Sequence, residues 1–285
     1  MIKVGTCGLS FSDWVGTVYP KGLKSSDMLR YYSRNLGFDL VEIDVAYYTL
    51  VKSRTVEGWA RGTPDEFKFA VKCHRGMTLN QKTPVDPRTV DNRDLFRAFT
   101  ETQKPILSSG KALTYLAQFG PVFFRNRQNI DYLKLFRERL PQLPLTVEFR
   151  HNSWLSPESI DDTFRLLREH NLGYAVVDEP AKRSLPAMIP GATNDIAYVR
   201  LHGRSSKWFE GDASLRYDYL YSDEELMEFI PVIRGLESGA RIAVVLFNNC
   251  HAGAALKNAI KLKQLLGLAG VFKEMDTPRQ LEMDF

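Results

Sequence analysis

Residues 197–209 read AYVRLHGRSSKWF, and the strand-like segment 198–202 within them decides the fold class. Successive side chains of a strand face opposite sides, so Arg200 and His202 share one side while Val199 and Leu201 share the other. The apolar side packs against a covering layer, which turns the arginine and the histidine toward the interior of the sheet. A parallel barrel explains such a strand, because functional groups of this fold gather where its strands end.

Short apolar runs alternate with amphipathic stretches along the whole chain, which predicts an α/β protein with a parallel sheet. The expected strands are 3–7, 40–45, 67–73, 113–119, 145–150, 173–178, 197–202 and 242–248, and the expected helices are 26–36, 54–61, 91–104, 129–140, 157–170, 222–236 and 253–266. The number of strands fits a single TIM-type (β/α)8 barrel. A doubly wound open sheet shares the alternation, but GTCGLSFSDW after the first strand lacks its glycine-rich dinucleotide turn.

Composition and charge narrow the class of protein but select no partner. We expect one barrel over residues 1–267 and a short C-terminal appendage over 268–285. The start MIKVGTCG lacks a secretory signal, no apolar run has membrane-spanning length, and three cysteines without paired spacing fit a reducing compartment. A cytoplasmic protein without a membrane partner is therefore expected. The net charge of +4 is small beside 38 basic and 34 acidic residues.

Polar side chains occupy inward positions in the last part of several expected strands. Choosing the register that keeps the outward side apolar leaves these residues inward: Glu42, Asp44, Lys72, Gln118, Glu148, Arg150, Asp178, Arg200, His202 and Asn248. Buried charges need partners or a ligand. The set is interpreted either as an ion-pair network, for example Glu42 with Lys72 and Glu148 with Arg200, or as a binding site. The number of contributing strands favours the site.

The loops after the strands supply further candidates. Gly203-Arg204-Ser205-Ser206 and the segment Asn249-Cys250-His251-Ala252-Gly253 stand where barrels commonly bind phosphate through backbone N–H groups and a helix N-terminus. Arg200 or Arg204 would add a bidentate contact. Aromatic rings of the same loops either stack on a ligand or pack the loops onto the rim. These rings belong to Trp14, Tyr19, Tyr47, Tyr48, Trp154, Trp208 and Phe209.

The sequence assigns no metal ligands, and the cofactor stays unknown. Cys73-His74 and Cys250-His251 invite a zinc hypothesis, but neighbouring strand residues point to opposite sides and make a poor pair for one ion. A carboxylate and histidine set is the better metal candidate, although still the lesser reading. That set comprises Glu42, Glu148, Asp178 and His202.

Seven ordered motifs resemble domain-of-unknown-function family 72, the YecE-like proteins, from residue 3 to about residue 267. They are GTCGLSFSDWVGTVYP at 5–20, VEIDVAYYTL at 41–50, TPDEFKFAVKCHRGMT at 63–78, VEFRHNSW at 147–154, VVDEP at 176–180, YVRLHGR at 198–204 and LFNNCHAGAALKNA at 246–259. The resemblance implies a TIM barrel but no reaction, because the activity of the family is not established. Matching polar positions are Glu42, Lys72, Glu148, Arg150, Asp178, Arg200, His202, Asn248 and Asn249, whereas Cys7, Leu9, Phe11 and Asp44 depart from the residues that the family usually carries.

These observations favour an enzyme that acts by acid/base chemistry on a small anionic substrate, such as a phosphorylated one, at the C-terminal face of the barrel. The expected catalytic residues are Glu42 and Glu148 as acid and base, Asp178 as an orienting group and His202 as a proton carrier near neutral pH. The expected substrate-binding residues are Lys72, Arg150, Arg200, Arg204, Asn248, Asn249, Tyr47 and Trp14.

Two other classes of function stay open. A nucleic-acid-processing barrel, with or without a metal, would use the same arginines and rings on phosphates and bases, in the manner of endonuclease IV. A non-catalytic ligand-binding protein would keep the barrel mouth as a sensor without turnover.

Overall fold

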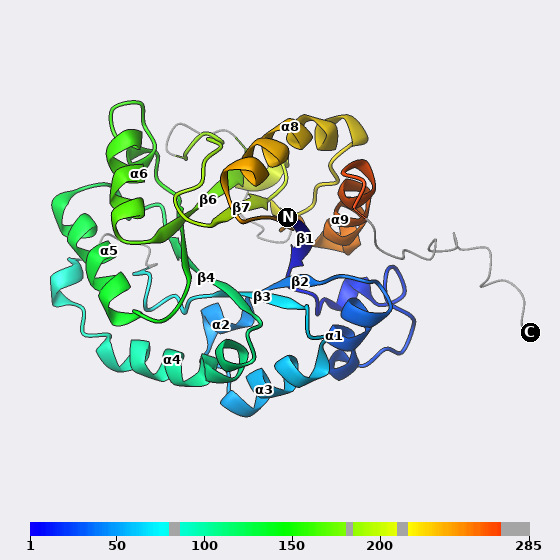
Figure 1. Ribbon diagram of the computed structural model, residues 1–285. Coiled ribbons are helices and arrows are strands. Elements are labelled where there is room, and N and C mark those ends of the chain that lie inside the picture. The colour runs from blue at the N-terminus through cyan, green and yellow to red at the C-terminus, as the bar shows by residue number, and fades with distance from the viewer. Residues whose placement is uncertain (80–85, 181–184, 210–215, 269–285) are drawn as a thin grey trace, which may run out of the picture.

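The computed structural model describes residues 1–79, 86–180, 185–209 and 216–268. Eight parallel strands follow one another in chain order, and β8 pairs with β1 to close the barrel (Figure 1). The strands are β1 Ile2–Cys7, β2 Leu40–Ile43, β3 Lys68–Lys72, β4 Ala112–Phe119, β5 Leu145–Phe149, β6 Leu172–Asp178, β7 Ile196–Leu201 and β8 Ile242–Phe247. The chain is thus an α/β protein with a single TIM-type barrel, as expected from its sequence. Apart from Leu268, the expected appendage lies outside the described residues.

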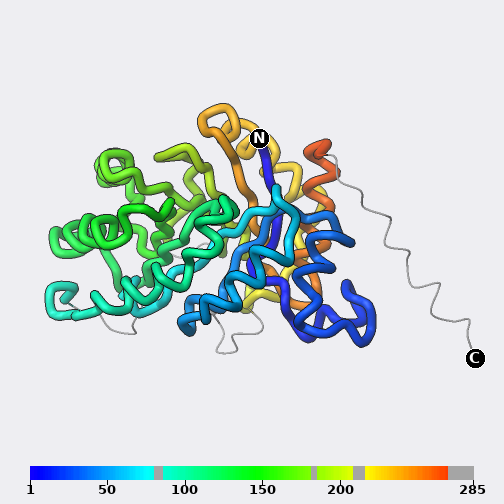
Figure 2. The backbone as a smooth tube through the Cα atoms, turned by 60° about the horizontal axis from the view of Figure 1, so that its bottom comes forward, coloured from blue at the N-terminus to red at the C-terminus, as the bar shows by residue number. Residues whose placement is uncertain are grey.

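Helices wrap around the outside of this barrel (Figures 1 and 2). They are α1 Ser25–Arg34, α2 Val45–Tyr48, α3 Ser53–Gly62, α4 Arg93–Ser108, α5 Arg127–Arg139, α6 Ile160–Glu169, α8 Asp223–Gly239 and α9 Ala254–Leu265. The short helix α2 was not expected. Asp44 was expected to lie in the strand. It has helical backbone angles instead, so β2 ends at Ile43 and α2 begins at Val45. Among the described helices, none combines the length and the apolar character needed to cross a bilayer.

The two sides of each strand belong to different packed layers. Outward side chains such as Val41, Phe69 and Val199 join the large core that the helices cover. Inward side chains form a second cluster that fills the barrel, including Tyr198 and Leu246. The interior is therefore packed, and the inward residues Glu42, Lys72, Glu148 and Arg200 lie toward the carboxyl ends of their strands, where the barrel opens.

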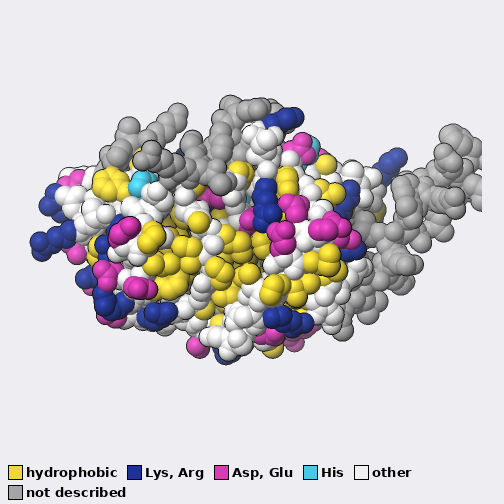
Figure 3. Space-filling model, turned by 90° about the horizontal axis from the view of Figure 1, so that it is seen from above, with side chains coloured by type: hydrophobic (Ala, Val, Ile, Leu, Met, Phe, Trp, Pro, Cys, Tyr) yellow, Lys and Arg dark blue, Asp and Glu magenta, His cyan; other side chains and the backbone are white. Residues whose placement is uncertain are grey.

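One side of the barrel departs from the regular alternation. No described helix follows β6, and residues 185–195 connect it to β7 without regular secondary structure. Seen from above, the face that carries α6 and α8 shows gathered apolar side chains (Figure 3). A shallow groove on α8 is lined there by Pro190, Ala192, Pro231, Val232 and Leu236.

Candidate active site

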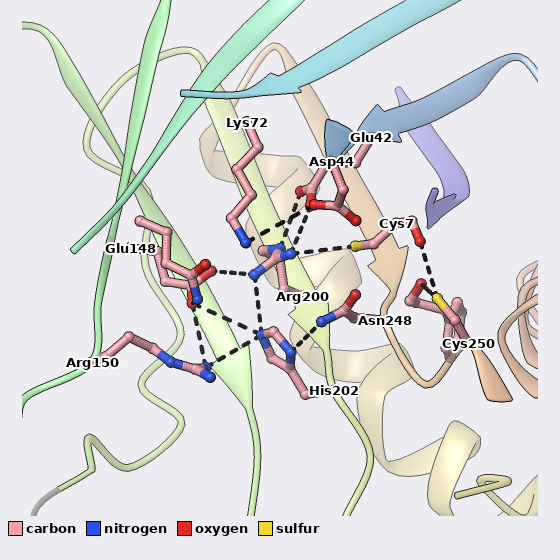
Figure 4. Close-up of polar contacts among 12 residues, drawn as sticks. Cys7, Glu42, Asp44, Lys72, Glu148, Arg150, Arg200, His202, Asn248 and Cys250 are labelled. Carbon is pink, nitrogen blue, oxygen red and sulfur yellow. Dashed lines mark hydrogen bonds and ion pairs between the residues drawn. The ribbon is translucent and has the colours of Figure 1, made fainter. Parts of the chain in front are cut away.

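Arg200 lies at the centre of the barrel mouth, and its guanidinium joins three strands (Figure 4). Its Nη2 and Nε donate to the carboxylate of Glu42 on β2 at 2.6 and 3.1 Å, and Nη1 donates to Glu148 Oε2 on β5 at 2.6 Å. The hydroxyl of Tyr198 adds a bond of 2.5 Å to Glu42 Oε2. Of the two expected ion pairs, Glu148 with Arg200 is present, whereas Glu42 binds Arg200 instead of Lys72.

The contacts between Arg200, Glu42 and Glu148 keep the two groups whose pKa values shift, Glu42 and Arg200, in their charged forms. Burial alone would raise the pKa of Glu42, but the positive charges of Arg200 and Lys72 outweigh it and lower that pKa. Burial would likewise lower the pKa of Arg200, yet Glu148 and Glu42 raise it well above its ordinary value. Glu148 also accepts a bond of 2.8 Å from Gln118 Nε2. The geometry thus makes Glu42 an ionised structural partner of Arg200 and a poor proton donor at neutral pH.

His202 is buried next to the network and is held in its neutral form. Burial, followed by the charges of Arg200 and Arg150, lowers its pKa well below the ordinary value of 6.5. Its Nε2 faces Nη1 of Arg200 at 3.2 Å and Nη1 of Arg150 at 3.4 Å. Guanidinium groups only donate, so Nε2 is the acceptor in its contacts with the two arginines, and Nδ1 lies 2.7 Å from Nδ2 of Asn248. This lowered pKa does not favour His202 as a proton carrier near neutral pH, and its role stays a prediction.

Two other carboxyl groups at the mouth have pKa values near neutrality. Burial and the neighbouring Glu42 raise the pKa of Asp44 to about 7. Burial also raises the pKa of Glu179 to about 7, although Arg150 opposes the change. Asp44 follows β2 and Glu179 follows β6, and these strands lie four positions apart in a ring of eight. The two groups therefore lie on opposite sides of the mouth.

Lys72 and Arg150 are two described cations of the mouth whose side chains reach its surface. Their side chains are 13% and 12% exposed, against 1% for Arg200. Lys72 Nζ lies 4.0 Å from Asp44 Oδ1 and 4.3 Å from the ring centre of Tyr47. Arg150 Nη1 lies 2.6 Å from Glu179 Oε2. Each accessible cation is thus placed beside one of the two carboxyl groups that titrate near neutrality.

Asp178 does not point into the barrel, which corrects the expectation from the sequence. Ala175 on β6 belongs to the inner cluster and Val176 to the outer core, so Asp178 shares the outward side and the inward carboxylate is Glu179. Asp178 accepts bonds from Arg204 at 3.0 and 3.1 Å and from the hydroxyl of Tyr221 at 2.6 Å. Arg204 and Asp178 therefore pair with each other on the outward side of the barrel.

Replacing Arg204 with alanine is expected to lower the free energy of unfolding by about 1–3 kcal/mol, since it removes the charged partner of a mostly buried carboxylate that keeps its tyrosine bond. Urea denaturation measures this loss. Anion affinity should stay unchanged, because Arg204 contacts neither Lys72 nor Arg150 in any bond described above. A selective loss of anion affinity in this variant would contradict the outward placement.

In the expected phosphate cradle, two backbone N–H groups already bond protein side chains. The N–H of Ala252, at the approach to α9, donates to Asp13 Oδ2 at 2.7 Å, and the N–H of Gly203 donates to the hydroxyl of Tyr221 at 2.8 Å. Asn249 was expected to bind substrate, but its buried amide donates to the carbonyl of Tyr219 at 2.8 Å. These three donors therefore already bond protein groups and hold the loops in place.

The loop aromatics mostly pack against the protein. Trp14 was expected to contact substrate, yet its ring is fully buried and its Nε1 donates to the carbonyl of Cys250 at 2.7 Å. Tyr19 and Trp154 are buried as well. Tyr47, half-buried beneath Lys72, stays at the rim. The side chains of Trp208 and Phe209 lie outside the described residues.

The cysteines lie in surroundings that favour the thiol. Cys7, Cys73 and Cys250 are buried, and burial raises the pKa of each thiol well above its ordinary value. Arg200 Nη2 lies 3.6 Å from Cys7 Sγ, which extends the central network to β1. Across residues 1–79, 86–180, 185–209 and 216–268, no three histidine, cysteine or acidic side chains form a group suited to a metal ion.

Comparison with known proteins places relatives along nearly the full chain. The sequence model of a family described as "Protein of unknown function DUF72" matches residues 3–281. UPF0759 protein YunF of Bacillus subtilis (strain 168) is 31% identical over 293 residues, which cover 99% of this chain and 100% of YunF. The crystal structure of a DUF72 family protein from Thermotoga maritima MSB8 is 39% identical, with a TM-score of 0.84 over 94% of this chain and 99% of that one. A second such structure, from Enterococcus faecalis V583, is 27% identical, with a TM-score of 0.83 over 94% and 96% of the two chains.

Proposed function

The chain belongs to the DUF72 family, and we propose that it is an acid/base enzyme that binds a small anionic substrate at the C-terminal face of its barrel. The observation that carries this proposal is the pairing of two titrating carboxyl groups with two accessible cations. Asp44 and Glu179, each with a pKa of about 7, lie beside Lys72 and Arg150 on opposite sides of the mouth.

This arrangement suits a reaction that removes one proton and supplies another. A group whose pKa lies near the working pH is populated in both forms, so one carboxylate can accept a proton while the other carboxyl donates one. Lys72 and Arg150 would hold the anionic group of the substrate between them. The network of Arg200, Glu42 and Glu148 would serve as a rigid floor, and neutral His202 would donate no proton. Glu179 replaces Asp178 in this assignment, and Asp44 replaces Glu42.

Sulfate is the probe that tests the anion site, because its charge is constant around neutral pH. Replacing Lys72 with alanine is expected to weaken sulfate binding by at least about tenfold, the loss of roughly 1.4 kcal/mol that one charge-assisted contact contributes. In the wild type, affinity should fall as the pH rises through about 7, since ionisation of Asp44 and Glu179 adds negative charge to the mouth. Isothermal titration calorimetry measures both effects.

Lys68 provides a matched control on the same strand. It lies at the opposite end of β3 and its Nζ bonds the carbonyl of Gly110 at 2.6 Å, so its replacement with alanine should leave sulfate affinity unchanged. Equal binding by the variants at positions 72 and 68, or no binding of sulfate, phosphate or small carboxylates by the wild type, would remove the basis of the proposal. A short oligonucleotide in the same titration separates it from nucleic-acid processing, which requires steep salt dependence.

A further inference from the structure

A large cavity lies beside the mouth, between the helices that flank β2. Its volume is about 600 Å³, and it extends along α1 and α3 under the loop that follows β1. Cavities of this size commonly bind small molecules when apolar walls surround a few polar groups. The apolar walls here are Leu9, Phe11, Leu29, Ile43, Val45 and Trp59.

The wall formed by α3 is built from residues that leave space. Thr55, Gly58, Trp59 and Gly62 line the cavity at spacings that place them on one side of the helix. A Cβ atom added to Gly58 or to Gly62 would meet no other atom within 4 Å. Glycine is a poor helix former, so larger residues at both positions would favour the helix and fill the cavity. With glycine at positions 58 and 62, this part of the cavity stays open.

Asp44 joins this cavity to the charged mouth. It belongs to the cavity lining, and its Oδ1 lies 4.0 Å from Lys72 Nζ. The same buried oxygen accepts no hydrogen bond from a described residue. A positive charge and a titrating carboxyl group thus stand at the inner end of a mainly apolar space, whose lining also includes Glu42 and the hydroxyl groups of Ser10, Ser25, Ser26 and Thr55. Arg30, exposed on α1, is the cation at the outer rim.

We propose that the cavity binds the apolar part of the substrate, so that the substrate is an amphiphilic anion with an aromatic or branched aliphatic body. The anionic group lies at Lys72 and the body lies between α1 and α3, against Phe11 and Trp59. This inference rests on the proposed function, because it names the class of molecule that the acid/base site would act on. It places Asp44 next to the atoms that join the two parts of the ligand.

A series of sulfonates with one constant head group tests the apolar part separately from the charge. Methanesulfonate, benzenesulfonate and naphthalene-2-sulfonate keep the same charge across neutral pH while their apolar area grows. Each added ring should tighten binding by on the order of tenfold, as expected when its surface leaves water. Benzyl alcohol, which has the ring without the charge, should bind more weakly than benzenesulfonate.

Filling the cavity should abolish the extra affinity of the larger sulfonates and keep the affinity that comes from the sulfonate charge. Replacing Gly58 with leucine places a side chain in the open space, so the three sulfonates should bind this variant with the affinity of methanesulfonate. Gly235 on α8 is the matched control, since it is a helical glycine whose added Cβ also meets no atom within 4 Å, and its replacement with leucine should preserve the series. Lys72→Ala should weaken all three sulfonates alike, and Arg30→Ala should weaken none.

The outcomes separate this inference from the function it rests on. If methanesulfonate binds and the larger sulfonates bind no better, the cavity inference is wrong while the anion site stands. Retention of the full gain by Gly58→Leu would overturn it as well. If no sulfonate binds the wild type, the proposed function fails together with it. Weaker binding in Arg30→Ala, with Lys72→Ala unaffected, would place the anion at the outer rim and contradict both.

Discussion

Replacing Arg200 with methionine is expected to lower the free energy of unfolding by about 3–5 kcal/mol at neutral pH, the cost of leaving buried charges without their partner. Both carboxylates that it binds are fully buried, and the contacts of 2.6 Å have no water to replace them. The loss should shrink in acid, because protonation of Glu42 removes an unpaired buried charge. Chemical denaturation at about pH 5 and pH 8 measures both effects.

Two controls distinguish lost charge pairing from lost packing. A variant that also carries Glu42→Gln and Glu148→Gln has no unpaired charge, so it should recover a large part of the stability that Arg200→Met loses. Arg234 forms a partly exposed pair with Glu237 and a bond to the carbonyl of Leu266, and its replacement with methionine should cost about 1 kcal/mol. A loss in Arg200→Met no greater than in Arg234→Met would show that the two carboxylates do not depend on Arg200.

The second large effect is a stability that falls as the pH rises toward 8. The pKa of Glu179 is about 7 in the folded protein and ordinarily 4.5, so between these values the native state holds a proton that the unfolded chain releases. The contribution of this bound proton to the free energy of unfolding is fully present below about pH 4.5 and is lost as the pH rises through 7. Glutamine at position 179 is neutral at every pH, so this variant does not lose stability as the pH rises. It should be more stable than the wild type at about pH 8 by roughly 3 kcal/mol. Asp44→Asn should act in the same direction.

Asp94 is the control for this pH dependence. Its side chain is 94% exposed, so Asp94→Asn should follow the wild-type profile of unfolding free energy against pH. If Glu179→Gln keeps the wild-type slope between about pH 5 and pH 8, Glu179 does not hold a proton there, and it cannot serve as the general acid.

The barrel was predictable because its signals are local. Strand and helix alternate along the chain, and one side of most strands is apolar, so eight such strands indicated a closed parallel sheet with charged ends. The inward positions of Glu42, Lys72, Glu148, Arg150, Arg200, His202 and Asn248 followed from that rule. They meet at the mouth as expected, although what they do there is still a prediction.

The register of β6 and the protonation of the carboxyl groups were not predictable, because both depend on residues far away in the sequence. Residues 173–177 of β6 read GYAVV, which is apolar on both sides, so choosing the apolar side as outward could not fix the register. The outward Asp178 is stable because Arg204 and Tyr221 arrive from another loop. The proton affinity of a carboxyl group is equally non-local, since it depends on how many cations reach it: Arg200 binds Glu42 with two nitrogens, while Glu179 shares Arg150.

The position of Arg200 in β7 also determines how late in synthesis the barrel can become compact. The ribosome makes β2 and β5, with Glu42 and Glu148, well before β7 supplies the arginine that neutralises them. A nascent chain that ends after β6 would have to bury two acidic groups without their shared counter-charge, which opposes collapse into a native-like partial barrel. Fragments of the first six strands should therefore stay open, and compaction should begin only when residues up to 200 have left the exit tunnel.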